Sequence, residues 1–71
     1  MNQLERARRC ARRMYDADRA SRDLGIAVTI PAPGDAEAVM TVTADLLNGF
    51  AVCHGGYLFT LADTAFAFAC N

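Results

Sequence analysis

The chain has 71 residues, 54% of them hydrophobic, and a formal net charge of −1 at pH 7. A chain of this length forms at most one domain, in the size range where a single hydrophobic core supplies little net stability. Its three cysteines, Cys10, Cys53 and Cys70, lack metal-ligand spacing, and their odd number without a secretory signal favours reduced thiols in a cytoplasmic protein over a disulfide scaffold.

Charge is distributed unevenly along the chain. Residues 1–23 hold all seven arginines and four acidic residues, whereas residues 24–71 hold the other four acidic residues and no lysine or arginine. We do not predict nucleic-acid binding by the arginines, because no lysine and no interleaved aromatic platform accompanies them. No run of about 18 apolar residues occurs, so no membrane segment is predicted either. The arginines are therefore interpreted as a solvated helix face.

The N-terminal segment, residues 1–23, is predicted to be helical. Small and apolar side chains recur at three- and four-residue spacing at Leu4, Ala7, Ala11 and Met14. With arginines between them, this pattern indicates an amphipathic helix from about Gln3 to Ala17 or Ala20. Gly25 is a plausible turn residue and ends the pattern.

Residues 24–71 begin with a predicted β-hairpin. Ile26, Val28 and Ile30 alternate with smaller residues and indicate a short strand, which the segment 31–35, with two prolines and a glycine, closes as a turn. The β-branched run 38–43 predicts the second strand. An irregular passage over residues 45–54 then leads to the last element.

The last predicted element is an apolar helix from about Gly56 to Cys70. From Leu58 onward its only polar side chains before the end are Thr60, Asp63 and Thr64, so the helix is expected to be buried. A two-stranded hairpin cannot cover such a helix. We therefore expect residues 24–71 to be the first part of a longer domain.

The entrance to this helix has the chemistry of an oxyanion-binding site. Unpaired N–H groups and about half a positive charge lie at a helix N-terminus, and Gly55 and Gly56 let a substrate carbonyl approach them closely. A purely structural turn is the alternative. His54 is a candidate ligand, acid/base group or orienting donor, or else a structural histidine that fixes the turn. Catalysis by the adjacent Cys53 is disfavoured, because neighbouring residues usually point apart and no third orienting group is visible.

Asp63 is the single carboxylate of the apolar helix. Seven residues separate it from Gly56, which corresponds to about 10 Å along a helix axis. One helix therefore cannot direct both groups to one reacting atom. A shared site requires Asp63 from a second copy of the chain, and a two-fold interface would create two such sites. The alternative is that Asp63 only forms a hydrogen bond to a neighbouring loop.

The motifs of the last third resemble a known family. They are Asn48-Gly49, His54-Gly55-Gly56, Phe59, Leu61-Ala62-Asp63 and the run 65–71. This pattern closely resembles the hotdog-fold acyl-CoA thioesterases of the phenylacetic acid degradation PaaI type. The match is dense over residues 48–71 and looser upstream.

The resemblance implies an α+β hotdog fold, in which an antiparallel sheet wraps round a central helix, with subunits joined as dimers or tetramers. It implies that Asp63 acts as nucleophile or general base across the dimer interface and that the Gly55 N–H polarises the thioester carbonyl. Asn48, His54 and Gly56 would position substrate, water or the turn. No metal and no separate cofactor is implied, because coenzyme A enters as part of the substrate.

The function expected from the resemblance is hydrolysis of an acyl-CoA, with an aromatic or medium-sized acyl group of the phenylacetyl type, to a free acid and coenzyme A. Residues 1–71 alone are expected to be inactive. Two alternatives stay open: a hotdog dehydratase or hydratase that acts on acyl-CoA, and a non-catalytic subunit that binds acyl-CoA.

Overall fold

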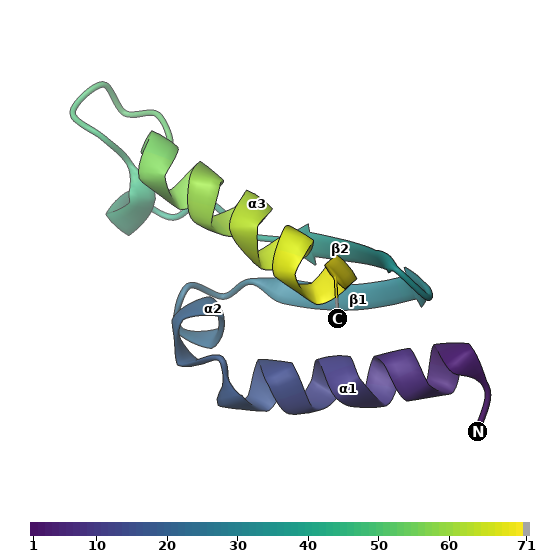
Figure 1. Ribbon diagram of the computed structural model, residues 1–71. Coiled ribbons are helices and arrows are strands. Elements are labelled where there is room, and N and C mark those ends of the chain that lie inside the picture. Colours follow the sequence, from purple (N-terminus) through teal and green to yellow (C-terminus); the bar gives the residue numbers. More distant parts are fainter. Residues whose placement is uncertain (71) are drawn as a thin grey trace.

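The fold is α+β, and the computed structural model describes residues 1–70 (Figure 1). The elements in chain order are helix α1 (Gln3–Ala17), helix α2 (Arg19–Asp23), strand β1 (Ala27–Ala32), strand β2 (Asp35–Val39), the 3-10 helix η1 (Ala44–Leu46) and helix α3 (Gly55–Cys70). The strands form an antiparallel hairpin. Helix α3 packs mainly against β2, and α1 packs against β1.

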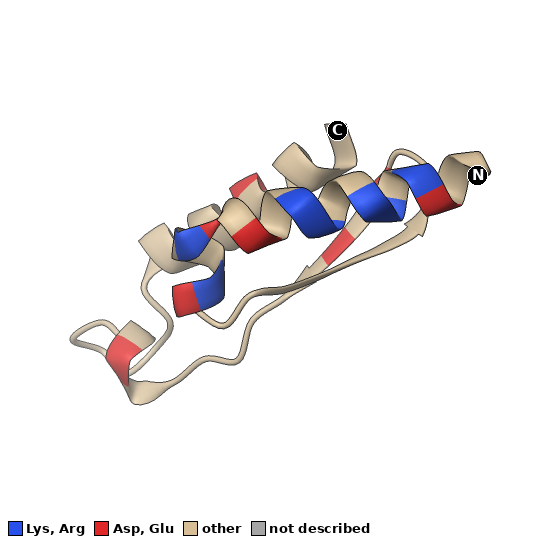
Figure 2. Ribbon diagram, turned by 90° about the horizontal axis from the view of Figure 1, so that it is seen from below, with Lys and Arg blue, Asp and Glu red and all other residues tan. Residues whose placement is uncertain are grey.

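Helix α1 confirms the predicted amphipathic helix. Asn2 caps it, because its Oδ1 accepts the Glu5 N–H at 2.8 Å while its Nδ2 donates to the Glu5 carboxylate at 3.1 Å. The predicted stripe of Leu4, Ala7, Ala11 and Met14 is half-buried, and the arginines between these residues are exposed. Figure 2 shows the basic residues gathered on α1 and α2.

Two side chains of α1 attach it to the outer edge of β1. The Tyr15 hydroxyl donates to the Ile26 carbonyl at 2.6 Å, and Arg8 Nε donates to the Ile30 carbonyl at 3.0 Å. An uncovered strand edge is a template for pairing with other chains. Helix α1 therefore shields this edge, although none of its own side chains is fully buried.

Asp18 separates α1 from α2. Its backbone leaves the helical region, with φ −91° and ψ 84°, and its side chain accepts the Ser21 N–H at 3.0 Å and the Ser21 hydroxyl at 2.6 Å. These hydrogen bonds, assisted by the Arg22 charge and opposed by burial, lower the pKa of the Asp18 carboxyl. The helix expected to continue to Ala17 or Ala20 therefore ends at Ala17, and a second short helix follows.

The hairpin was predicted, but the bounds of its second strand were wrong. Strand β1 continues through Pro31 to Ala32, and the turn consists of Pro33 and Gly34 alone, with φ +83° at Gly34. The register shifts between Thr29 and Ala32, an irregularity that accommodates a proline in a strand. Strand β2 therefore starts at Asp35.

Strand β2 ends at Val39, and the predicted strand residues 40–43 lie outside it. Ala27, the first residue of β1, is the partner of Val39. Before Ala27 the chain turns at Gly25, which has φ +72°. Residues 40–43 therefore have no strand residue of β1 opposite them, and their β-branched side chains alone do not extend the strand.

The core is small and lies between the hairpin and α3. Its buried apolar side chains are Ile26, Ile30, Leu46 and Phe68. The Tyr15 and Phe68 rings lie 6.5 Å apart between centroids. As expected for a helix that a two-stranded hairpin cannot cover, part of α3 is exposed, with Phe59 and Phe66 at 74% and 71%. The hairpin covers only one face of the helix. No helix within residues 1–70 is long and apolar enough to span a membrane.

Tyr15→Phe tests the attachment of α1 to the strand edge. The substitution removes the hydrogen bond to the Ile26 carbonyl and keeps the ring against Phe68, so we expect a loss of about 1 kcal/mol in the free energy of unfolding of the full-length protein. Tyr57→Phe is the matched control, because within residues 1–70 the Tyr57 hydroxyl has no hydrogen bond. Urea denaturation measures both. Equal losses would contradict the role of the Tyr15 hydroxyl.

Asp18 makes stability depend on pH in a defined direction. Because its pKa is lowered in the folded state, its contribution is complete above the ordinary aspartate pKa of about 3.9 and is lost as the pH falls through the lowered value. Asp18→Asn should therefore destabilise the full-length protein at pH 7 and flatten this part of its acid transition. Asp16→Asn, at an exposed position on α1, is the control. Denaturation midpoints between pH 2 and pH 7 test the difference.

Candidate active site at the start of helix α3

The loop before α3 is closed by Asn48. The Asn48 Oδ1 accepts the N–H groups of Phe50 at 2.9 Å and Val52 at 3.3 Å, and the Asn48 N–H donates to the Val52 carbonyl at 2.7 Å. Ala51 has φ +60°, which is uncommon for a residue other than glycine. These bonds give the loop a defined shape. The Asn48 oxygen is thus engaged in holding the turn.

His54 is the N-terminal cap of α3. Its N–H donates to the Leu46 carbonyl at 2.8 Å, and its carbonyl accepts the N–H groups of Tyr57 at 3.0 Å and Leu58 at 3.4 Å. Its imidazole Nδ1 accepts the Gly56 N–H at 3.0 Å. The neutral ring must therefore carry its proton on Nε2. In this chain His54 therefore fixes the turn, which is the structural role that the sequence left open as an alternative.

The Gly55 N–H differs from the other amides of the first turn of α3. The N–H groups of the next three residues are all accepted by His54, but within residues 1–70 the Gly55 N–H has no acceptor. A Cβ built on Gly55 would meet nothing within 4 Å, whereas one on Gly56 would lie 3.1 Å from the His54 Nδ1. Gly56 therefore makes room for the cap, and Gly55 leaves a hydrogen-bond donor beside open space.

Asp63 lies on the exposed face of α3. Within residues 1–70 its carboxylate forms no hydrogen bond or ion pair, so the alternative of a bond to a neighbouring loop is not found there. Phe59 and Phe66, one turn away on either side, are also exposed. Asp63 is exposed in this chain because the hairpin covers the opposite face of α3, which carries Thr64 and Phe68.

One chain does not bring the Gly55 N–H and Asp63 together. Both belong to the unbroken helix Gly55–Cys70, and eight residues correspond to about 12 Å of rise. The separation inferred from sequence spacing therefore holds. Asn48, His54, Gly55 and Gly56 form one cluster around the start of α3, and Asp63 stands apart from it.

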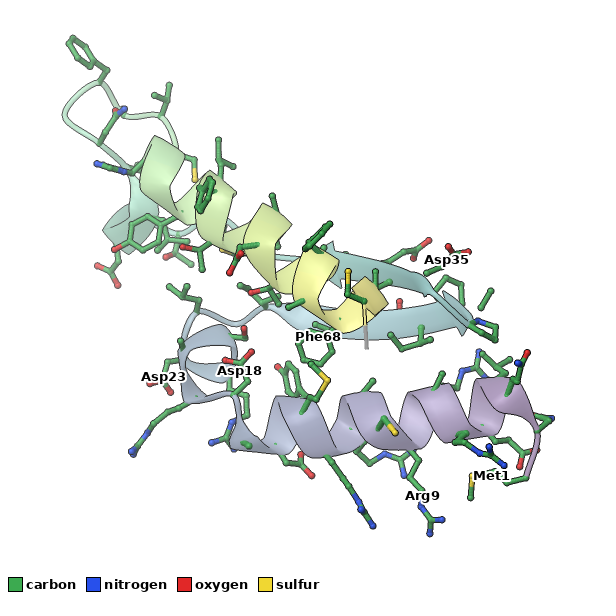
Figure 3. The ribbon with its side chains drawn as sticks, in the orientation of Figure 1. Met1, Arg9, Asp18, Asp23, Asp35 and Phe68 are labelled. Carbon is green, nitrogen blue, oxygen red and sulfur yellow. The ribbon has the colours of Figure 1, made fainter. Side chains whose placement is uncertain are left out.

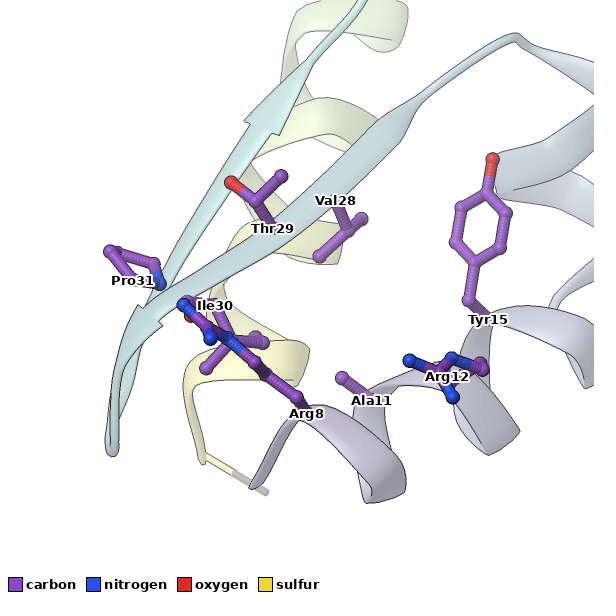
Figure 4. A pocket seen from close by; sticks show the side chains of 8 residues that line it. All are labelled: Arg8, Ala11, Arg12, Tyr15, Val28, Thr29, Ile30 and Pro31. Atoms are coloured by element: carbon purple, nitrogen blue, oxygen red, sulfur yellow. The ribbon is translucent and has the colours of Figure 1, made fainter. Parts of the chain in front are cut away.

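A hollow of about 560 Å³ lies elsewhere, between α1 and β1 (Figure 4). Its lining consists of Arg8, Ala11, Arg12, Tyr15, Val28, Thr29, Ile30 and Pro31. None of the predicted site residues belongs to it. Within residues 1–70 no group of three or more His, Cys, Asp or Glu side chains could hold a metal ion.

A buried polar contact between α2 and α3 was missed by the sequence reasoning. Ser21 and Thr64 are 2% and 7% exposed, and their hydroxyl oxygens lie 3.2 Å apart. The Asp18-x-x-Ser21 spacing, typical of a helix cap, was the available signal for one half of this contact. Nothing in the sequence indicates that Thr64 is its partner, 43 residues later.

Substitution of each glycine by alanine tests their different roles. Gly55→Ala should leave the full-length protein as stable as before or up to about 1 kcal/mol more stable, because alanine restricts the unfolded chain. Gly56→Ala should not stabilise the protein in this way and should displace the His54 ring, because the alanine Cβ would crowd the His54 Nδ1. Denaturation midpoints and the NMR shifts of the His54 ring measure the two effects. Identical behaviour of the two variants would contradict the assignment.

Comparisons with known proteins agree with the fold. No family model matches the chain. The chain is 54% identical over 61 residues to the acyl-coenzyme A thioesterase PaaI of Escherichia coli K12, covering 86% of this chain and 44% of that protein. It is 41% identical over 58 residues to an Archaeoglobus fulgidus protein provisionally named an esterase, covering 82% of this chain and 38% of that protein.

A solved structure of the E. coli PaaI protein, from the phenylacetic acid degradation operon, superposes with a TM-score of 0.93 at 48% identity. The superposition covers 99% of this chain and 51% of that one. The chain thus spans about half the length of the relatives it matches. In sequence and in fold, it matches about half of a hotdog protein of the PaaI thioesterase type, which confirms the resemblance inferred from its motifs.

Proposed function

We propose that the full-length protein hydrolyses an acyl-CoA thioester to a carboxylic acid and free coenzyme A. The observation that carries this proposal is the Gly55 N–H, the one amide in the first turn of α3 that has no acceptor within residues 1–70. The 54% identity to a protein named as an acyl-CoA thioesterase supports the choice of reaction.

The chemistry follows from the charge that develops on the substrate. Attack on a thioester carbonyl places negative charge on its oxygen, which the Gly55 N–H and the positive end of the α3 dipole stabilise. Asp63 either attacks the carbonyl carbon itself or removes a proton from an attacking water. The carbon–sulfur bond then breaks, and the coenzyme A thiolate leaves and takes up a proton. In the general-base route the attacking water gives its oxygen to the acid, and its protons pass to Asp63 and the thiolate. In the direct route water then hydrolyses the acyl–Asp63 anhydride, which releases the acid and regenerates the carboxylate.

The site requires two copies of the chain, because Gly55 and Asp63 lie about 12 Å apart on one rigid helix. A two-fold axis that brings Gly55 of one copy beside Asp63 of the other pairs the two α3 helices in antiparallel directions. Phe59 is midway between residues 55 and 63, so it lies at the two-fold axis and faces Phe59 of the other copy. Its 74% exposure within this chain fits such a contact. We propose a homodimer with two equivalent sites, alone or within a tetramer.

The other residues of the cluster orient the site. Asn48 holds the loop and His54 holds the first turn of α3, which fixes the direction of the Gly55 N–H. The His54 Nε2–H remains as a further donor toward substrate or water. Phe66, one turn after Asp63, offers exposed apolar surface outside the proposed Phe59 contact, which fits an aromatic or medium-sized acyl group such as phenylacetyl.

Asp63→Asn tests the proposal in the full-length protein. We expect kcat for thiol release from phenylacetyl-CoA to fall at least about 100-fold, because the variant lacks the base or nucleophile, while the fold and oligomeric state are retained. Glu37→Gln, at an exposed position on β2, is the charge-matched control and should keep wild-type turnover. A single turnover in oxygen-18 water tests the two roles of Asp63, because label enters its carboxylate only when water hydrolyses an acyl–Asp63 anhydride.

Near-wild-type turnover by the Asp63→Asn variant would exclude the assignment of this residue. Wild-type protein that hydrates an enoyl-CoA or dehydrates a hydroxyacyl-CoA without releasing thiol would indicate the dehydratase or hydratase alternative. Tight binding of acyl-CoA with neither reaction would indicate the non-catalytic subunit.

A further inference from the structure

The hydroxyl pair Ser21–Thr64 is a directional contact in the packing of α3. Ser21 donates its only hydroxyl hydrogen to the Asp18 Oδ2 at 2.6 Å, so Thr64 must be the donor in the 3.2 Å contact with the Ser21 oxygen. A chain of hydrogen bonds thus leads from Thr64 on α3 through Ser21 to Asp18 at the start of α2. Figure 3 shows Asp18 at that start and Phe68 on the face of α3 turned toward α1.

Three hydrogen bonds fix the position of Ser21, whose hydroxyl oxygen accepts the Thr64 hydrogen. The N–H and the hydroxyl of Ser21 both donate to the Asp18 carboxylate, and the Ser21 carbonyl accepts the Ile26 N–H at 2.9 Å. Ile26 is fully buried at the approach to β1. The Ser21 oxygen therefore has a defined position relative to the hairpin, and α3 must place Thr64 opposite it.

The other side chains on the covered face of α3 restrain rotation of the helix about its axis less than Thr64 does. One turn before Thr64 the half-buried residues are Thr60 and Leu61, and Thr60 donates only to the Gly56 carbonyl of its own helix. One turn after it, Phe68 makes a tilted ring contact with Tyr15, which is not directional to the same degree. A hydrogen bond between two nearly inaccessible hydroxyls has a stricter geometry than these contacts.

We propose that Ser21 and Thr64 are positioning residues, which set the rotation of α3 and thereby aim Asp63 at the thioester. Asp63 precedes Thr64, so its side chain must project about 100° round the helix from the fixed Thr64 hydroxyl. A small rotation of α3 would leave the core packed but move the carboxylate along an arc. This inference rests on the proposed thioesterase function.

Thr64→Val in the full-length protein tests the inference, because valine keeps the shape of threonine and loses the hydroxyl. We expect kcat for phenylacetyl-CoA hydrolysis to fall about 10- to 100-fold, as for a misaligned catalytic group, while KM stays within about twofold. Thr64→Ser restores the hydroxyl and should recover turnover to within about threefold of the wild type, by the same alignment argument. Thr60→Val is the matched control, since its hydroxyl bond stays within α3, and should keep wild-type kcat.

A double-mutant cycle separates positioning from simple stability. Ser21→Ala and Thr64→Val should each lower kcat per folded molecule, and the double variant should lower it no further than the stronger single variant, because both remove one contact. A purely structural role predicts lower unfolding midpoints with kcat per folded molecule unchanged, and that result would overturn the inference. Wild-type kcat in the folded Thr64→Val variant would overturn it as well. Wild-type protein that releases no thiol from acyl-CoA instead contradicts the proposed function.

Discussion

Four backbone N–H groups begin helix α3, and the way they are satisfied governs the site. A helix cannot accept these hydrogens itself, so they need a cap, water or a ligand. His54 supplies the cap with two different groups, its carbonyl and its imidazole Nδ1, and accepts three of the four. The Gly55 N–H is left over, at the positive end of a 16-residue helix. Within residues 1–70, the first turn of α3 therefore presents a single N–H donor without an acceptor, and it points in a fixed direction.

This arrangement depends on residues on both sides of His54. Upstream, the closed loop of Asn48 and the bond from the His54 N–H to Leu46 hold the backbone of the histidine in place. Downstream, Gly56 lacks the Cβ that would crowd the imidazole. The site thus uses its two glycines for different purposes, one to admit the histidine ring and one to leave space beside a donor. Residue type alone does not distinguish the two glycines, and only the family resemblance assigns them different roles in the sequence.

The sequence predicted those parts of the fold that depend on local pattern. The amphipathic stripe of α1, the turn at Gly25 and the long apolar helix all follow from spacing or from a residue with special backbone freedom, and all are present. The predicted bounds of β2 were wrong because a strand needs a partner strand. Val39 pairs with Ala27, the first residue of β1, so no residue of β1 lies opposite residues 40–43. The Ser21–Thr64 contact joins residues 43 positions apart, and no local pattern encodes such a pairing. The face of α3 that the hairpin covers, and with it the exposure of Asp63, likewise depends on contacts between distant residues.

The two groups proposed to take part in the reaction are held by different parts of the chain. The Gly55 N–H is positioned by the loop 48–54 through short-range bonds, whereas the face on which Asp63 lies depends on the contacts of Thr64 and Phe68 with α2 and α1. Because one rigid helix carries both, neither can approach the other within a chain, and any rotation of α3 displaces Asp63 more than the amide near the helix axis. Accurate placement of the carboxylate is therefore the stricter requirement. The N-terminal helices contribute no candidate reactive group, but they contact Thr64 and Phe68 on the covered face of α3 and thereby fix the direction in which Asp63 projects from the exposed face.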